Sequence, residues 1–194
     1  MEGMKPEDVL KIIAEVRGDA IVIPTMTTAP AWREIAPDDL SVSCVGFMGG
    51  ASSMGLGIAL ARPDRRVVVF DGDGSLLMQL GSLATNAGAR ARNFVHLLFK
   101  NNVYHTSGAQ LVPGADGIDF VLMAKGAGYR SAYAITDFSD FKKRAKSIVH
   151  TEEGPLFVEL LTGLAEKTPM TARGTSVPFP TQVEDLRARL LQGA

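Results

Sequence analysis

The sequence is poor in cysteine and carries no excess of charge of either sign. Its 194 residues include one cysteine, Cys44, which excludes an internal disulfide and a cysteine-bound metal cluster within the chain. A single cysteine also suits a reducing compartment, so we expect a cytoplasmic protein. Lys and Arg number 20 against 21 Asp and Glu, a formal net charge of -1. The chain therefore lacks the basic surface expected of a nucleic-acid-binding protein.

Long hydrophobic runs without polar residues are also missing. Charged residues are spread through the first 20 positions, so no signal-peptide core fits there. The longest charge-free stretch, residues 40–61, is long enough to cross a bilayer. It contains five glycines and four serines, however, and three arginines follow within five residues. We interpret it as a buried loop followed by a helix and expect no membrane association.

The composition that remains is that of an ordinary globular domain, with 46% hydrophobic and 21% charged residues. Apolar runs and segments of helical periodicity alternate along the chain. The expected strands are residues 20–23, 66–70, 94–99, 129–134 and 156–161, with residues 41–45 as a further candidate. The expected helices are residues 7–17, 51–61, 76–87, 118–127, 138–149 and 182–191.

This alternation predicts an α/β fold, a doubly wound parallel sheet with helices on both faces. The strand segments are continuously apolar, as in sheets that are covered on both sides. Ligands of such sheets bind at the carboxyl ends of the strands. The loops after Phe70 and Phe99 are therefore the best candidates for a binding site.

Residues 162–180 are rich in proline, glycine and threonine and lead to the last predicted helix. Two interpretations stay open for this segment. It is either a surface connection or an arm that embraces a neighbouring subunit.

The first candidate loop contains Gly72, Asp73, Gly74 and Ser75, directly after a predicted strand and before a predicted helix. Glycines allow the backbone to approach a ligand closely, and Ser75 is of the type that caps a helix. A helix N-terminus favours an anion such as a diphosphate. Asp73 would offer a carboxylate oxygen to Mg²⁺.

The second candidate loop begins with Asn101 and Asn102, after the next predicted strand. Consecutive parallel strands can bring their carboxyl ends to the same edge of a sheet. The amide oxygen of Asn102 would then join Asp73 at one ion. Mg²⁺ prefers octahedral oxygen coordination with few protein ligands, which suits one carboxylate, one amide and one main-chain carbonyl.

Gly72-Asp73-Gly74, followed after 26 residues by Asn101-Asn102, resembles the cofactor motif of the thiamine diphosphate (ThDP)-dependent enzymes. The resemblance covers residues 19–161 and is to the diphosphate-binding (PP) domain of that family. It implies ThDP and Mg²⁺ as cofactors. We accordingly interpret residues 1–194 as a single PP domain, with a C-terminal arm and helix at about 162–194.

The resemblance also implies roles for individual residues. Mg²⁺ would be bound by the side chains of Asp73 and Asn102 and by the carbonyl of Tyr104. This loop is one residue shorter than in some relatives, which leaves the carbonyl ligand open by one position. The diphosphate would contact three residues of the first loop, namely Gly72, Gly74 and Ser75.

An upstream glycine-rich segment, residues 46–57, extends the resemblance. In the family, an apolar side chain at the position of Met48 wedges under the cofactor and bends it. The Gly46 carbonyl would accept a hydrogen bond from the aminopyrimidine, and Gly49 belongs to the same cofactor-binding segment. Taken alone, Met48 would be read as a core residue.

Within the family, residues 49–57 and 101–110 are most similar to phosphonopyruvate and sulfopyruvate decarboxylases. This implies conversion of a small 2-oxoacid to an aldehyde and CO₂. The glutamate that activates ThDP comes from a pyrimidine-binding (Pyr) domain, for which this chain has no room. We therefore expect a PP-carrying (beta) subunit that is incomplete alone and forms a hetero-oligomer with a Pyr-domain (alpha) subunit of similar size.

Two other functions fit the same motif. The chain would be half of a ThDP-dependent carboligase, similar to acetolactate synthase or transketolase, or a non-catalytic ThDP-binding module. His105, in the second loop, is a candidate for substrate contact or proton transfer, and equally for a structural role. We expect His96, inside a predicted strand, to be a hydrogen-bonded core residue, and Cys44 to be buried and not a nucleophile.

Overall fold

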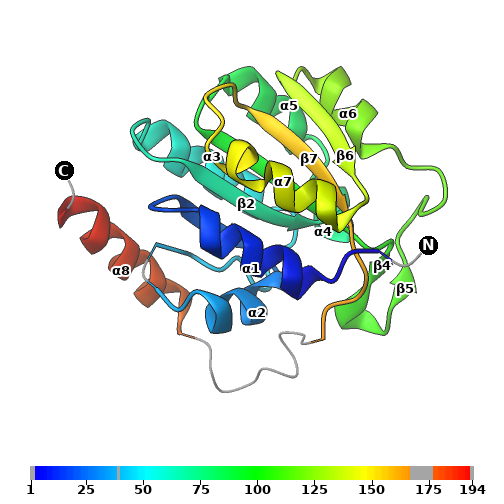
Figure 1. Ribbon diagram of the computed structural model, residues 1–194, viewed down its shortest axis with the longest axis horizontal. Coiled ribbons are helices and arrows are strands. Elements are labelled where there is room, and N and C mark those ends of the chain that lie inside the picture. Colours follow the sequence, from blue (N-terminus) through cyan, green and yellow to red (C-terminus); the bar gives the residue numbers. More distant parts are fainter. Residues whose placement is uncertain (1–2, 39, 167–176, 193–194) are drawn as a thin grey trace.

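The computed structural model describes residues 3–38, 40–166 and 177–192 (Figure 1). Its strands are β1 (Ile21–Pro24), β2 (Val67–Gly72), β3 (Phe94–Lys100), β4 (Val103–Tyr104), β5 (Gln110–Leu111), β6 (Ser131–Ile135) and β7 (Leu156–Leu161). Its helices are α1 (Pro6–Val16), α2 (Thr28–Ile35), α3 (Ala51–Ala61), α4 (Asp73–Met78), α5 (Ser82–Ala89), α6 (Phe120–Ala127), α7 (Phe138–Val149) and α8 (Phe179–Gln192), with a 3-10 turn η1 (His105–Ser107).

Five parallel strands form the central sheet in the order β1-β2-β3-β7-β6, which confirms the predicted fold class. β2 and β3 are neighbours, with Val67 paired to Phe94 and Gly72 to Phe99. The two candidate loops therefore leave adjacent strands at one edge of the sheet. Residues 67–71 of β2 are completely buried, because helices cover both faces of this strand.

The side chains of β2 alternate between two hydrophobic cores. Val68 and Phe70 face a core built with α1, α2 and α7. Val67 and Val69 face a second core, built with α3, α5 and α6. Figure 1 shows α1 and α7 in front of the sheet and α3, α5 and α6 behind it.

Residues 41–45 do not form a strand, contrary to the expectation. They run beside β1 and make only two isolated bridges, at Ser41 and Cys44. The Val22 N–H donates to Leu40 O, and the Cys44 N–H donates to Pro24 O. Pro24 has no N–H of its own, so the ladder cannot continue between these two bridges.

The predicted helix at residues 76–87 is divided into α4 and α5. The helix also starts earlier than expected, at Asp73, so Ser75 lies inside it and does not cap it. The Ser75 hydroxyl instead accepts a hydrogen bond from the Gly49 N–H at 2.9 Å. Gln79 leaves the helical conformation after α4 and packs against Gly49. The break therefore brings the upstream glycine segment against the first candidate loop.

The helix α2, the strands β4 and β5 and the turn η1 escaped prediction. α2 has eight residues, and the turn that leads into it is closed by the Thr28 hydroxyl, which accepts from the Thr25 N–H at 3.0 Å. β4 and β5 pair antiparallel over two residues each. Strands this short carry no readable periodicity.

The N-terminal segment is attached to the segment that follows β7. Met4 bridges Thr162 after β7, and the Glu166 N–H donates to Glu7. Residues 167–176, within the predicted 162–180 connection, lie outside the described residues. The predicted C-terminal helix is present as α8, where Gln182 accepts a hydrogen bond from the Ser43 N–H. None of the described helices is long and apolar enough to cross a membrane.

Candidate functional site

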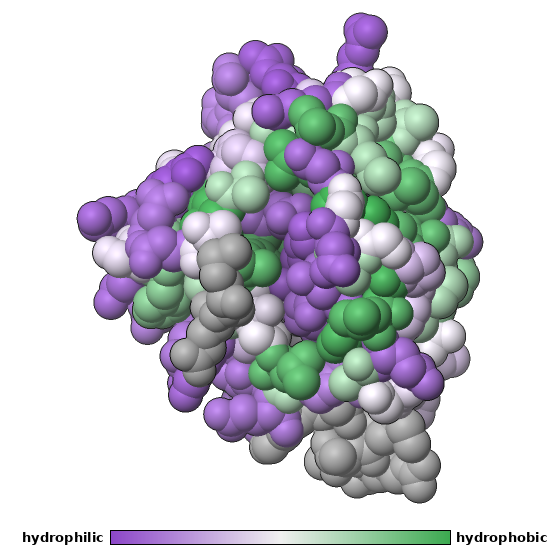
Figure 2. Space-filling view, turned by 90° about the vertical axis from the view of Figure 1, so that its right-hand side faces the viewer, coloured by the Kyte–Doolittle hydropathy of each residue, from purple (hydrophilic) through white to green (hydrophobic). Residues whose placement is uncertain are grey.

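A pocket lies at the carboxyl edge of the sheet, where the segments after β1, β2, β3 and β7 meet. Met48, from the upstream glycine segment, and Pro6, at the start of α1, complete its lining. Figure 2 looks onto this edge, where hydrophilic residues gather in the centre and hydrophobic residues flank them. The two loops singled out in the sequence therefore open into one pocket.

Asp73 is the acidic residue of this pocket, and its side chain is almost completely buried. Its Oδ1 accepts from the Gly74 N–H at 2.8 Å. Its Oδ2 accepts from the Asn101 N–H at 3.0 Å and from the Asn102 N–H. Burial raises the pKa of the Asp73 carboxyl, and these hydrogen bonds act in the opposite direction. A bound cation would compensate the charge of the buried carboxylate further.

Asn102 has the features of a pre-arranged oxygen ligand. Its backbone is left-handed, with φ of 64°. Its side-chain Oδ1 is buried and accepts no hydrogen bond among the described residues. A buried amide oxygen without a partner is costly unless something binds it. The Asn102 N–H donates to Asp73, so the backbone of Asn102 lies at the carboxylate, although Asn102 is not among the residues that line the pocket. A carboxylate and an amide oxygen on neighbouring loops are ligands that suit a divalent cation.

Tyr104 contributes to the pocket through its ring and its backbone. The ring lies over Gly74, where an added Cβ would come within 2.5 Å of Tyr104 Cε1. Its carbonyl accepts from the Ala109 N–H at 3.1 Å, which leaves one lone pair for another ligand. Among the described residues, no group of three or more His, Cys, Asp and Glu side chains is placed to hold a metal. A cation here would therefore need amide and carbonyl oxygens beside Asp73.

The upstream segment is only partly in the pocket. Met48 lines it, as expected for a residue under a cofactor. Gly49 contacts it indirectly, through the hydrogen bond to Ser75. Gly46 has a left-handed backbone, with φ of 80°, and is not among the lining residues. Its carbonyl role stays a prediction.

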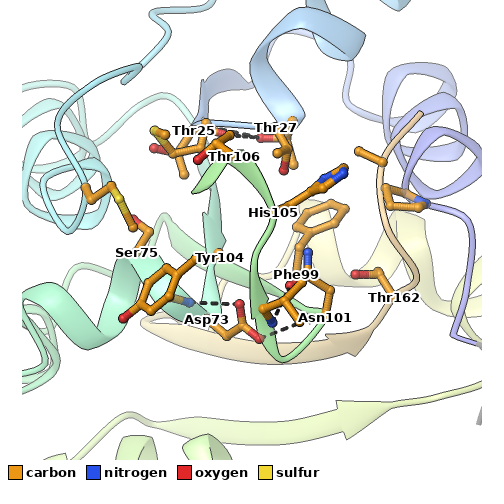
Figure 3. Close-up of a pocket in the computed structure, with 18 residues that line it drawn as sticks. Thr25, Thr27, Asp73, Ser75, Phe99, Asn101, Tyr104, His105, Thr106 and Thr162 are labelled. Carbon is orange, nitrogen blue, oxygen red and sulfur yellow. Dashed lines mark hydrogen bonds between the residues drawn. The ribbon is translucent and has the colours of Figure 1, made fainter. Parts of the chain in front are cut away.

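His105 lies in the pocket, on the turn that follows β4 (Figure 3). Its Nδ1 is buried and without a hydrogen-bond partner among the described residues. In Figure 3 the ring lies between Phe99 and Thr27. The position is compatible with either role expected for this histidine.

Sequence reasoning missed the threonines of this pocket. Thr25, Thr27 and Thr28 follow β1, and Figure 3 shows Thr106 beside Thr25 and Thr27. Thr25 is buried, and its hydroxyl donates to Cys44 O at 2.8 Å. The available signal was the run of hydroxyl residues directly after the strand that ends at Pro24.

The pocket has an unusual balance of charge. Its described lining contains Asp73 and no lysine or arginine. Lys100 lies close to the pocket, but its Nζ donates to Ile118 O at 3.2 Å and lies 3.5 Å from Glu159. An anionic ligand would therefore depend on neutral donors, on the N-terminus of the following helix and on a bound cation.

The described residues thus combine a parallel α/β sheet, a buried carboxylate at its carboxyl edge and an amide oxygen without a hydrogen-bond partner on the neighbouring loop, an arrangement that suits a cation together with an anionic ligand. Comparison with known families specifies the class. Residues 25–160 match the family of thiamine pyrophosphate enzymes, in its C-terminal TPP binding domain, and the chain belongs to this family. Thiamine pyrophosphate is another name for ThDP.

Several known proteins are similar to the chain. A phosphonopyruvate decarboxylase of Streptomyces viridochromogenes is 39% identical, over 77% of this chain and 37% of the relative. The sulfopyruvate decarboxylase subunit beta of Methanocaldococcus jannaschii is 28% identical, over 91% of this chain and 90% of that subunit. A solved ThDP-dependent 4-hydroxybenzoylformate decarboxylase of Rhodococcus jostii RHA1 shares the fold, with a TM-score of 0.68, 22% identity and coverage of 86% and 34%. The chain thus spans little more than a third of the first relative.

Proposed function

We propose that this chain is the PP-type (beta) subunit of a ThDP- and Mg²⁺-dependent 2-oxoacid decarboxylase. The observation that carries the proposal is the hydrogen bond from the Asn102 N–H to the buried Asp73 carboxylate, together with an Asn102 Oδ1 that is buried and has no partner among the described residues. Membership of the thiamine pyrophosphate enzyme family supports the choice of cofactor. The names of the similar proteins support decarboxylation of a small 2-oxoacid to an aldehyde and CO₂.

In this proposal the chain anchors the charged end of the cofactor. Asp73, Asn102 and the Tyr104 carbonyl bind Mg²⁺. Gly72, Gly74 and Ser75 lie against the diphosphate, and the pocket threonines supply further donors. Met48 packs under the cofactor, and the Gly46 carbonyl accepts from its aminopyrimidine. When bound, ThDP supplies the electron sink that decarboxylation of a 2-oxoacid needs.

We assign the substrate to the class of 2-oxoacids that bear a second acidic group, such as a sulfonate or phosphonate. The similar proteins act on such acids, according to their names. The described lining offers no lysine or arginine to that second group. We therefore assign its recognition mainly to the partner subunit, with His105 as the candidate contact from this chain.

The partner in this proposal is a Pyr-domain (alpha) subunit of similar size, which supplies the activating glutamate. Large hydrophobic side chains next to the pocket support a subunit interface. Phe47, Met78 and Leu111 are 58%, 54% and 67% exposed, far more than core residues. The similar Methanocaldococcus protein is itself named a subunit. We propose a cytoplasmic hetero-oligomer.

The experiment is a comparison of the purified chain with the complex formed with its partner. Both are supplied with ThDP, Mg²⁺ and either sulfopyruvate or phosphonopyruvate, and CO₂ and aldehyde are measured. We expect turnover by the complex and none by the chain alone. Carbon–carbon bond formation without aldehyde release would favour a carboligase. Full turnover by the chain alone would contradict the role of a partner.

A further inference from the structure

Three buried polar side chains, linked by hydrogen bonds, lie behind residues 72–75. These residues form the first turn of α4 with its N-cap Gly72 and are called the Gly72–Ser75 turn below. Asp71, at the end of β2, and His96, in the middle of β3, are both completely buried. His96 Nε2 lies 3.3 Å from Asp71 Oδ2, and His96 Nδ1 lies 3.1 Å from the Tyr129 hydroxyl. His96 is thus the hydrogen-bonded core histidine that the sequence predicted, and its partner directly precedes the cofactor motif.

The donors and acceptors of this network follow from its chemistry. A carboxylate only accepts hydrogen bonds, and we therefore assign the proton of the contact between His96 and Asp71 to His96 Nε2. His96 Nδ1 then accepts from the Tyr129 hydroxyl. Burial raises the pKa of Tyr129, so its hydroxyl keeps the proton that it donates. The other carboxylate oxygen, Asp71 Oδ1, accepts from the Gly72 N–H at 2.9 Å.

The aromatic surroundings keep His96 in this orientation. The Phe157 ring meets it edge-on, with centroids 5.2 Å apart, and Phe94 and Tyr129 lie tilted against it at 6.2 and 6.3 Å. An imidazole held in this way has little freedom to rotate away from Asp71. The hydrogen bond from His96 therefore fixes the Asp71 carboxylate, and this carboxylate holds the first amide of the turn.

We propose that His96 is a positioning residue that, through Asp71, fixes the Gly72–Ser75 turn which presents Asp73 to Mg²⁺. The inference rests on the proposed function, because it concerns the same ion. Outer-shell partners of metal ligands typically change metal affinity by about 10- to 100-fold. His96 differs from such partners in one respect: it touches no ligand itself and acts through the backbone of the turn.

Three variants separate the parts of the network. His96→Leu removes both hydrogen bonds, His96→Gln keeps a donor at a similar reach from Asp71, and Tyr129→Phe removes only the distal hydroxyl. Phe141→Leu is the control, because Phe141 is a completely buried residue in the core on the opposite face of the sheet. It should lower the melting temperature without disturbing Asp71.

Two measurements are made on each variant. Amide hydrogen exchange of the peptide around Gly72–Ser75 is followed in the cofactor-free full-length chain. Mg²⁺ is then titrated into the complex with its partner in the presence of ThDP. We expect His96→Leu to accelerate the exchange and to weaken Mg²⁺ binding about 10- to 100-fold. His96→Gln should stay within about threefold of the wild type, and Tyr129→Phe should fall between the two.

The inference is overturned if a folded His96→Leu variant matches the wild type in both measurements. It is also overturned if Phe141→Leu, at an equal loss of melting temperature, produces the same changes. If His96→Leu does not fold, the Tyr129→Phe variant decides. The inference is then overturned if this variant has the same hydrogen exchange and the same Mg²⁺ affinity as the wild type. Failure of the wild-type complex to bind Mg²⁺ with ThDP would instead contradict the proposed function, and the exchange data would still decide on the network.

Discussion

At the scale of single residues, Asn102 combines a left-handed backbone with a buried amide oxygen that has no hydrogen-bond partner in the described part of the chain. Asn102→Gly separates the two features, because glycine adopts positive φ without strain. We expect the variant to keep its fold and to lose at least about tenfold in Mg²⁺ affinity, which corresponds to ~1.4 kcal/mol. Titration of Mg²⁺ in the presence of ThDP measures the effect.

Ala109→Gly is the matched control for this substitution. Ala109 also has positive φ, 56°, and lies in the same loop. Its side chain carries no oxygen, so Mg²⁺ affinity should not change. Equal losses in the two glycine variants would show that loop flexibility, and not the Asn102 oxygen, determines the affinity.

Gly74 tests whether ThDP binding requires the close contact between the Gly74 backbone and the Tyr104 ring. A Cβ at this position would lie 2.5 and 2.6 Å from two carbons of the Tyr104 ring. We expect Gly74→Ala to displace the ring and to weaken ThDP binding about tenfold or more, ~1.4 kcal/mol. Tyr104→Ala in the same chain should restore most of the affinity, because the proposed ligand is the Tyr104 carbonyl. Without such a rescue, the steric explanation fails.

Cys44 is a buried free cysteine whose carbonyl accepts a hydrogen bond from Thr25 of the pocket, so its reactivity reports whether this region is folded. Burial raises the pKa of its thiol above the ordinary value of 9.0. The contribution of the buried thiol to stability is therefore complete below about pH 9 and is lost as the pH rises through the folded-state pKa. We expect a thiol reagent such as DTNB to react at neutral pH only after unfolding. The fall in stability between pH 8 and 10 should be smaller in Cys44→Ala, and equal falls would contradict this.

At the scale of elements, the packing of α3 on β2 depends on one of its glycines. A Cβ at Gly55 would collide with Val69, whereas a Cβ at Gly57 would meet nothing. Gly55→Ala should lower the free energy of unfolding by about 1–3 kcal/mol. Gly57→Ala, in the same helix, should raise it by up to about 1 kcal/mol, because alanine favours helices. Chemical denaturation of both variants measures the difference, and equal effects would contradict the proposed packing.

The elements that the sequence predicted well are those with a continuous apolar pattern. β2, β3 and β7 were recognised because helices bury them on both faces. The pattern failed where hydrogen bonds between separate segments determine the structure. Pro24 interrupts the ladder that residues 41–45 would have formed, and Ser75 bonds Gly49 instead of capping a helix. Neither contact can be predicted from the sequence pattern, because the residues that form it are far apart in the chain.

At the scale of the whole molecule, the pocket is the meeting point of segments separated by up to 159 positions, from Pro6 to Ala165. The sequence predicted the two central segments, around Asp73 and Asn102, because a spaced motif marks them. It did not predict the threonines, since hydroxyl residues after a strand are a signal too common to identify a binding site by themselves. Only the sheet order shows that β1 and β7 flank the motif strands.

The central claim of the proposed function is that this chain works in a complex with a second subunit. One measurement addresses it directly: native mass spectrometry of the protein purified gently from its own source. We expect the 20.7 kDa chain to appear in a complex with a second chain of similar size, carrying ThDP and Mg²⁺. An assembly that contains this chain alone, or a complex without ThDP, would contradict the account.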